Sequence, residues 1–391
     1  MSGLQLLAGP DLSIGAERFA SHAGRLGPLP KAGHSLIELL VRVSLTGRGG
    51  AGFPVGLKWR AVAAASRGSA VVLVNGAEGE PHSKKDRLLM STRPHLVIDG
   101  ALLAAASVRA KEIVLYIGEQ HQAAFRSMTE AVAERKADEQ RMIRIVAAPA
   151  RYVAGDSSAT VHLVDSGLAT PTTTPPPPRE RGVRGAPTLV QNVETLAHVA
   201  LIARTGAATN TVLVTVAGAV RTPGVFEISA GTRLGDAVQL AGGPSEPARA
   251  VLLGGYFGRW LDAADAWLLP IDPQALRDRG LSLGCGVIGV MPVRQCPVCE
   301  VAGIMRYLAS ESSAQCGPCF FGLRALADAC TRIAERGTDP GDLQRLQRWA
   351  GEVQGRGACK HPDGAVMFLL SAMKTFGGDF ANHPAHLRRT A

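Results

Sequence analysis

A glycine-rich stretch near the amino terminus most constrains how this chain folds. Residues 47–59 hold five glycines within their first ten positions and continue directly into Lys58 and Trp59. Because glycine has no β-carbon, such a backbone can approach a ligand closely and present its N–H groups to an anion. Glycine runs also serve as plain turns. The composition of the stretch alone leaves both interpretations open.

The flanking segments place this stretch inside an α/β unit. Ser35 and Glu38 have the spacing of a capping box, and apolar residues at helical spacing follow as far as Val43. This pattern predicts a helix that leads into the glycines. Residues 70–74 form a short apolar run typical of a buried strand. Glycines between a helix and a strand are a common setting for phosphate sites.

Helical and strand patterns alternate through the first half of the chain, which predicts one doubly wound α/β domain over residues 1–206. The expected helices are 96–108, 120–135 and 196–203, and the expected further strands are 112–117 and 142–146. Polar residues follow the first strand at 75–87, where α/β folds place ligand-contacting groups. A solvated charged loop would have the same composition.

Two more polar turns follow in this half. Residues 152–158 should begin another helix, capped by Asp156 or a serine. Residues 170–178 include four consecutive prolines and predict an extended crossing. Residues 185–195 then return to polar side chains just before a helix.

The pattern changes twice after residue 206. Residues 207–265 alternate apolar side chains with turn residues and predict a small β-grasp domain. Residues 266–391 are mainly helical, with helices expected at 302–308, 322–336, 340–348 and 363–376. All seven cysteines fall in this last part. Such clustering indicates metal or iron–sulfur ligation rather than disulfides.

The net charge and the hydropathy of the chain limit its possible binding partners and its place in the cell. The 42 basic and 33 acidic residues give a net charge of +9, which suits a nucleic acid, an anionic cofactor or an acidic protein. No basic run is interleaved with aromatic residues, so nucleic-acid binding is not expected. There is no stretch of eighteen apolar residues and no signal-peptide pattern. We therefore expect a cytoplasmic protein without direct membrane insertion, reaching a membrane only through partner subunits.

In their order and over most of the chain, these motifs resemble the NADH-binding FMN subunit of respiratory complex I and the diaphorase subunits of NAD-linked hydrogenases and formate dehydrogenases. The resemblance rests on the glycine loop, the segments 75–87 and 187–195, the β-grasp pattern and the late cysteines. It implies a Rossmann-like FMN-binding domain, an SLBB-like β-grasp domain and a C-terminal helical bundle that carries an iron–sulfur site. In that family FMN oxidises NADH and passes single electrons to a [4Fe-4S] cluster.

The resemblance assigns cofactor-binding residues to four segments. They are Gly47, Arg48, Gly49, Gly52 and Lys58 in the glycine loop, Asn75 and Glu78 after the first strand, Tyr152, Gly155 and Asp156 at the next turn, and Val190, Gln191, Asn192 and Thr195 in the last motif. Ala77 and Ser157 stand where the family usually has an aspartate and a glutamate. The FMN pattern is otherwise well matched.

The nucleotide pattern is matched less well. Phe53 and Glu80 are the expected nucleotide contacts, but Ala61 and Pro177 stand where the family has phenylalanines that stack on the adenine. Stacking is worth about 1–3 kcal/mol per base, so two losses would weaken binding considerably. The electron donor is therefore left open among NAD(H), NADP(H) and a protein.

The cluster motif departs from the family at one ligand. Cys316, Cys319 and Cys359 match three of the family's thiolates, while Ser313 replaces the first. A serinate ligand, a three-iron cluster, or a thiol recruited from residues 296–299 would complete the site, with His361 as a weaker candidate. The pair in 296–299 could equally be core packing. Cys330, which falls inside a predicted helix, is expected in the core.

The sequence thus supports two functions. The first is a diaphorase-type flavoprotein oxidoreductase that moves electrons between NAD(P)H and a one-electron acceptor such as a ferredoxin, as part of a larger complex. The second is an electron-transfer or docking subunit that has lost NADH binding and exchanges electrons only with a protein partner attracted by the basic charge. A structural relative without any cofactor is a third hypothesis.

Overall fold

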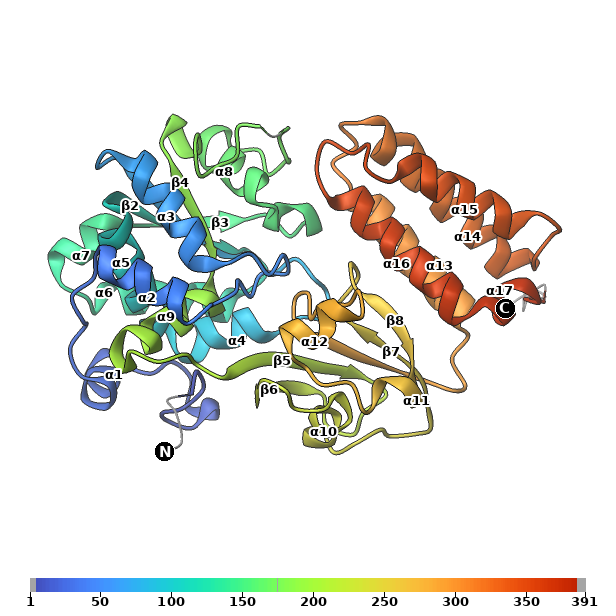
Figure 1. Ribbon diagram of the computed structural model, residues 1–391, viewed down its shortest axis with the longest axis horizontal. Coiled ribbons are helices and arrows are strands. Elements are labelled where there is room, and N and C mark those ends of the chain that lie inside the picture. The colour runs from blue at the N-terminus through green and yellow to red at the C-terminus, as the bar shows by residue number, and fades with distance from the viewer. Residues whose placement is uncertain (1–4, 174, 385–391) are drawn as a thin grey trace. The chain divides into compact units, whose positions relative to one another are not determined.

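The computed structural model describes residues 5–173 and 175–384, which divide into two compact units (Figure 1). The first unit is Met1–Thr215 with Val225–Ala230, and the second is Val216–Gly224 with Gly231–Ala391. Thr174, within the extended crossing predicted at 170–178, lies outside the described residues.

The first unit is built on a parallel sheet of four strands in the order β3-β2-β1-β4 (Figure 1). Its strands are β1 (Ala70–Gly76), β2 (Ala110–Gly118), β3 (Ile143–Ala148) and β4 (Thr188–Asn192). The last strand returns to pair with the first, and Asn75 lies directly opposite Asn192. The connections leaving β1 and β4 therefore start side by side, which is the arrangement that forms ligand sites in open α/β sheets.

Helices cover both faces of this sheet. They are α1 (Phe19–Leu26), α2 (His34–Arg42), α3 (Val55–Ser66), α4 (Lys85–Thr92), α5 (Pro94–Val108), α6 (Gln122–Ala133), α7 (Ala137–Met142), α8 (Ser157–Ser166) and α9 (Val193–Thr205). Val72 and Val74 join the core with α2, α3, α5, α6 and α9, while Val71 and Leu73 join a smaller core with α8. This alternation is what a strand buried on both faces requires, and it confirms the predicted doubly wound domain.

Two local expectations near the glycine stretch are wrong. The capping box does not form, because α2 begins one residue before Ser35 with Gly33 as its N-cap, and Glu38 instead contacts Arg60 at 2.8 Å. The glycines also do not run on to a strand, since α3 intervenes. Val55, Trp59 and Val62 are its buried side, at helical spacing.

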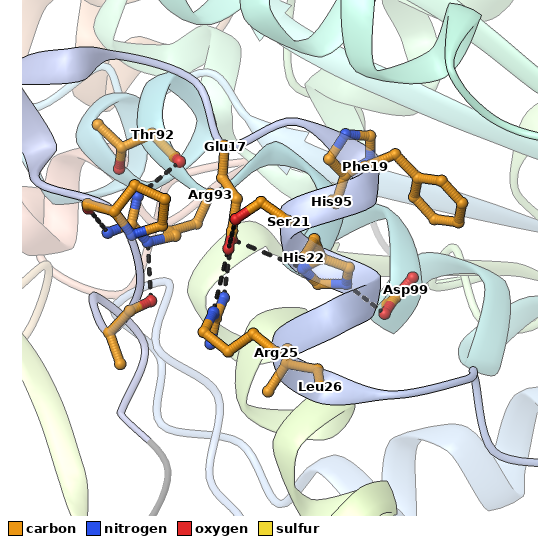
Figure 2. Close-up of polar contacts among 12 residues, drawn as sticks. Glu17, Phe19, Ser21, His22, Arg25, Leu26, Thr92, Arg93, His95 and Asp99 are labelled. Atoms are coloured by element: carbon orange, nitrogen blue, oxygen red, sulfur yellow. Dashed lines mark hydrogen bonds and ion pairs between the residues drawn. The ribbon is translucent and has the colours of Figure 1, made fainter.

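A buried ion cluster ties α1 to α5 (Figure 2). His22 contacts Asp99 through Nε2 at 2.8 Å, and Arg25 contacts Glu17 at 2.7 Å. Arg135, just after α6, reaches the other oxygen of Asp99 at 2.8 Å. Burial alone would raise the pKa of Asp99, but the hydrogen bond with His22 and the charge of Arg135 outweigh it and hold that pKa at about 2. The cluster therefore stabilises the fold while Asp99 is ionised.

This lowered pKa predicts an acid-sensitive fold. The stabilisation from Asp99 is fully present above its ordinary pKa of 3.8 and is lost as the pH falls through about 2. Asp99→Asn should remove about 2 kcal/mol of this pH-dependent stability between pH 5 and 2. Urea unfolding at stepped pH would measure the loss, with the exposed Asp138→Asn as the control. Equal pH slopes in Asp99→Asn and the unmodified chain would contradict the prediction.

The second unit combines an antiparallel sheet with a helical bundle (Figure 1). Its strands are β7 (Ala248–Leu253), β8 (Arg259–Asp262) and β9 (Val287–Pro292), and β7 pairs with both β8 and β9. Two further strands, β5 (Thr211–Gly218) and β6 (Gly224–Ser229), lie for the most part in the first unit. The helices are α10 (Leu234–Leu240), α11 (Ala263–Ala266), α12 (Pro273–Asp278), α13 (Pro297–Ser310), α14 (Arg324–Arg336), α15 (Asp342–Val353), α16 (His361–Thr375) and α17 (Gly377–Ala381). Helices α13 and α15 each pack on both α14 and α16.

Trp260 of β8 contacts Phe368 and Phe376 and so joins this sheet to the bundle. Among the described residues, no helix is long and apolar enough to span a bilayer.

Candidate functional site

The predicted flavin residues meet at the carboxyl ends of β1 and β4. The N–H of Arg48 donates to the hydroxyl of Thr195 at 2.9 Å. A β-carbon on Gly49 would lie 3.1 Å from Cβ of Asn192, which is closer than side chains normally pack. The loop between α2 and α3 thus lies against the start of α9, where only glycine fits at position 49 without displacing its neighbour.

The loop is shaped to expose N–H groups. Its ends are closed by the N–H of Gly47, which donates to the Phe53 carbonyl at 2.9 Å. Gly50 and Gly52 have φ values of 106° and 61°, which side chains rarely adopt. Within the described residues, the N–H groups of positions 49–51 have no hydrogen-bond acceptor. These donors, rather than that of Gly47, are the ones that fit an anion.

Two cationic side chains belong to this loop and to the helix that follows it. The Nε atom of Arg48 is buried without a hydrogen-bond partner in the described part of the chain. Lys58, in the first turn of α3, donates from Nζ to the Val190 carbonyl at 2.5 Å. Burial, helped by the charge of Arg179, lowers the pKa of Lys58 to about 8. A bound phosphate would give the Arg48 Nε an acceptor and Lys58 an opposite charge, so the residues present fit the phosphate of FMN.

A buried triad that sequence reasoning missed supports this edge of the sheet. Lys85 contacts Asp86 at 2.7 Å and Glu194 at 2.8 Å, and Asn192 donates to the second oxygen of Asp86 at 2.7 Å. Burial would raise the pKa of Glu194, but Lys85 and His198 outweigh it and hold that pKa at about 2. Lys85 keeps its charge because the two carboxylates overcome its burial and raise its pKa.

The sequence does contain a sign of this triad, because its residues fall in two of the polar motifs already identified. Lys85 and Asp86 follow β1 in the polar segment 75–87, and Glu194 falls inside the same motif as Asn192 and Thr195. Opposite charges at the ends of two paired strands could have been matched with each other.

Glu78, a predicted flavin contact, binds groups of the following helix. Its carboxylate accepts hydrogen bonds from the Ser83 hydroxyl at 2.7 Å and from the N–H groups of Asp86 and Arg87 at 2.8 and 2.9 Å. It therefore satisfies the free N–H groups at the start of α4. The positive φ of 42° at Glu78 turns the chain so that the carboxylate can fold back onto them.

The turn before α8 lies against the end of β1. Asn75 donates to the Gly155 carbonyl at 2.9 Å, and the Tyr152 hydroxyl donates to Glu80 at 3.1 Å. Asp156 caps α8, as predicted, by accepting from two N–H groups of its first turn. This turn is therefore held against the segment that follows β1.

The remaining predicted residues differ in exposure. Gln191 is buried and accepts from the indole of Trp59 at 3.4 Å. The Phe53 ring is 49% exposed, which leaves it accessible for stacking. Ala61 and Ser157 are also exposed.

In the second unit, three of the predicted cluster residues are neighbours. Cys316 and Cys319 flank the start of the π-helical turn Pro318–Leu323, and Cys359 lies just before α16. Burial, together with the nearby thiols of Cys316 and Cys359, raises the pKa of Cys319 to about 12. Free thiolates are therefore disfavoured here. Iron ions would offset that cost, so the three thiols fit an iron–sulfur cluster.

The hydroxyl that contacts Cys319 belongs to Ser312 rather than Ser313. Ser313 is half-buried in the loop before these thiols, next to Ala314 with a positive φ of 53°. His361 uses Nε2 to contact the Leu308 carbonyl at 2.7 Å. Cys330 is fully buried within α14, which confirms its predicted place in the core.

Family models match three segments of the chain. The model for the Nuo51 FMN-binding domain matches residues 41–201, the SLBB domain matches 213–255, and the NADH-ubiquinone oxidoreductase-F iron-sulfur binding region matches 300–383. The predicted FMN, β-grasp and cluster regions are thereby confirmed. The order of the three is the order expected from the sequence.

Comparisons over most of the chain also find NADH-quinone oxidoreductase F subunits. The second NADH-quinone oxidoreductase F subunit of Rhizobium meliloti is 31% identical, over 89% of this chain and 88% of the relative. The NADH-quinone oxidoreductase F subunit of Salmonella typhimurium is 32% identical, over 88% of this chain and 83% of the relative.

A solved structure of the NAD⁺-reducing [NiFe]-hydrogenase in the H2-reduced state matches with a TM-score of 0.79 and 28% identity, over 88% of this chain and 62% of that chain. The air-oxidised state matches with a TM-score of 0.80 and 29% identity, over 91% of this chain and 64% of that chain. This chain therefore spans less than two thirds of the hydrogenase chains. On the strength of the near full-length match to the Rhizobium meliloti relative, the chain belongs to the family of NADH-quinone oxidoreductase F subunits.

Proposed function

We propose that this chain oxidises NADH with FMN held at the glycine loop, and passes single electrons through a [4Fe-4S] cluster in the second unit to an electron-carrier protein. The observation that carries the proposal is the set of N–H groups at positions 49–51 that have no acceptor among the described residues, together with the unpaired Nε of Arg48. The names of the relatives refer to NADH and NAD⁺, which supports the NADH-linked hypothesis over the docking-only one.

The protein's own residues would position the cofactor. The N–H groups of the glycine loop, with Arg48 and Lys58, would hold the phosphate, while Asn192 and Thr195 keep that loop against α9. Bound FMN would supply the exchange between two-electron oxidation of NADH and one-electron transfer. Phe53 and Glu80 would contact the nucleotide.

Cys316, Cys319 and Cys359 would hold the cluster, with Ser313 as the fourth ligand. The half-buried Ser313 stands three positions before Cys316, as Cys316 stands before Cys319. A one-electron acceptor such as a ferredoxin, or a partner subunit of a larger complex, would take the electrons. We place the protein in the cytoplasm, at a membrane only through such partners.

A cofactor inventory tests the function. Anaerobically purified protein should contain FMN, iron and sulfide, and NADH should bleach its flavin absorbance within seconds. Bleaching by a reduced ferredoxin but by neither NADH nor NADPH would overturn the NADH assignment in favour of the docking-only hypothesis. Colourless protein after reconstitution with FMN and iron would overturn both.

Lys58→Met tests the phosphate site directly. Because a hydrogen bond to a charged group contributes about 1.5–3 kcal/mol, the variant should bind FMN about 10-fold to 100-fold more weakly. Quenching of FMN fluorescence by the apoprotein gives the affinity, and the exposed Lys31→Met serves as the matched control. Equal affinities in the two variants would remove Lys58 from the site.

A further inference from the structure

A second group of metal-binding side chains lies in the second unit. Cys296, Cys299 and His383 bring one ligand atom each to within 4.8 Å of one another. Among the described residues, the three cysteines assigned to the iron–sulfur site do not belong to this group. Cys296 and Cys299 lie at one end of α13, whereas His383 follows α17, more than 80 positions later in the chain.

The two sulfurs are fixed by the start of a helix. Cys296 is the N-cap of α13, and its sulfur accepts from the N–H of Cys299 at 3.5 Å. Pro297 occupies the first helical position, which sets the backbone between the two cysteines. Cysteines spaced in this way present both thiols on one side of the helix end, as the C-x₂-C half of many zinc sites does.

The imidazole is oriented as a metal ligand would be. Nε2 of His383 lies 3.2 Å from the Ala334 carbonyl, so a neutral ring that donates this hydrogen bond carries its lone pair on Nδ1. Metal-binding histidines commonly use a backbone carbonyl in this way to fix the ring. The side chain is buried, and its own carbonyl accepts from the N–H of Thr338 at 3.1 Å.

We propose that Cys296, Cys299 and His383 bind one zinc ion in a site separate from the iron–sulfur cluster. Two thiolates and one imidazole are a donor set that zinc prefers over hard cations. Tetrahedral zinc would hold these atoms about 3.3–3.8 Å apart, so the present limit of 4.8 Å requires only small side-chain rotations. A water molecule would complete the tetrahedron.

The ion would fasten the carboxyl-terminal end of the chain to α13. The short helix α17 is otherwise joined to the bundle by contacts such as the Thr338 hydroxyl, which donates to the Phe380 carbonyl at 2.6 Å. Closing a loop of this length with a metal restricts the unfolded chain and stabilises the folded one. The site is structural, and its existence does not depend on the proposed NADH oxidation.

Metal analysis of purified full-length protein tests the proposal. The unmodified protein should retain about one zinc per chain after desalting, besides its iron. Cys299→Ser should lower zinc at least fivefold and leave iron unchanged, while Cys285→Ser, which changes a thiol outside the group, should keep both. Zinc retention in Cys299→Ser, or a parallel loss of iron and zinc, would overturn the proposal. A parallel loss would assign these thiols to the cluster.

A spectroscopic measurement on the unmodified protein avoids the risk that a variant fails to fold. After zinc is removed by a chelator, added Co²⁺ should give near-ultraviolet thiolate-to-cobalt charge-transfer absorption and intense visible bands of a tetrahedral site. Both should saturate at one ion per chain and disappear on addition of zinc. Weak visible bands without thiolate absorption would contradict the site.

Discussion

Lys85→Met is expected to lower the free energy of unfolding by about 3–5 kcal/mol. Lys85 is fully buried and contacts the carboxylates of Asp86 and Glu194 at 2.7 and 2.8 Å. Methionine fills a similar volume but leaves two acidic groups buried close together without their cation. The loss comes from those unpaired charges rather than from a cavity.

Chemical unfolding at neutral pH would measure this loss, with Arg60→Met as the matched control. Arg60 forms an ion pair of similar length with Glu38, at 2.8 Å, but both side chains are more than 40% exposed, so its removal should cost only about 0–1 kcal/mol. Adding Glu194→Gln to Lys85→Met should restore part of the stability, because it removes one unpaired charge. Similar losses in the Lys85 and Arg60 variants would mean that the triad contributes little.

The triad also shows where sequence reasoning stops. The sequence predicts the glycine loop, the alternating α/β pattern and the cluster of cysteines because each depends on local composition and spacing. Lys85 and Asp86 stand in a polar, turn-rich segment that looks solvated, and their burial follows from α4 turning back against α9. A side chain's exposure depends on such tertiary packing, which a single sequence does not specify.

The same limit explains the errors around the glycines. Ser35 and Glu38 have the correct capping spacing, but the helix starts earlier, and Glu38 pairs with a residue 22 positions away. Helix α3 was missed because its first turn follows directly on the glycine stretch. The pairing of Glu38 with Arg60 depends on tertiary packing rather than on local pattern.

Cys316→Ala is expected to lower cluster-bound iron at least about tenfold, because only two of the three matched thiolates would remain. Cys316 is half-buried, so its removal should leave the fold largely intact. Iron and sulfide per chain, with the electron paramagnetic resonance spectrum of reduced protein, give the measurement. Cys330→Ala is the control, since that thiol is buried in α14 and takes no part in the site. Unchanged iron in Cys316→Ala would remove the cluster from these residues.

Substitutions at Ser313 then identify the fourth ligand. If the Ser313 oxygen binds iron, Ser313→Ala should convert the cluster to a three-iron form or speed its loss to a chelator, because one corner of the cluster lacks a protein ligand. Ser313→Cys should slow that loss below the rate of the unmodified protein, since it restores four thiolates. The two variants therefore move the rate in opposite directions. A cluster that responds to neither has its fourth ligand elsewhere, and Cys296→Ala with Cys299→Ser would show by their iron content whether that ligand is one of the two thiols assigned here to zinc.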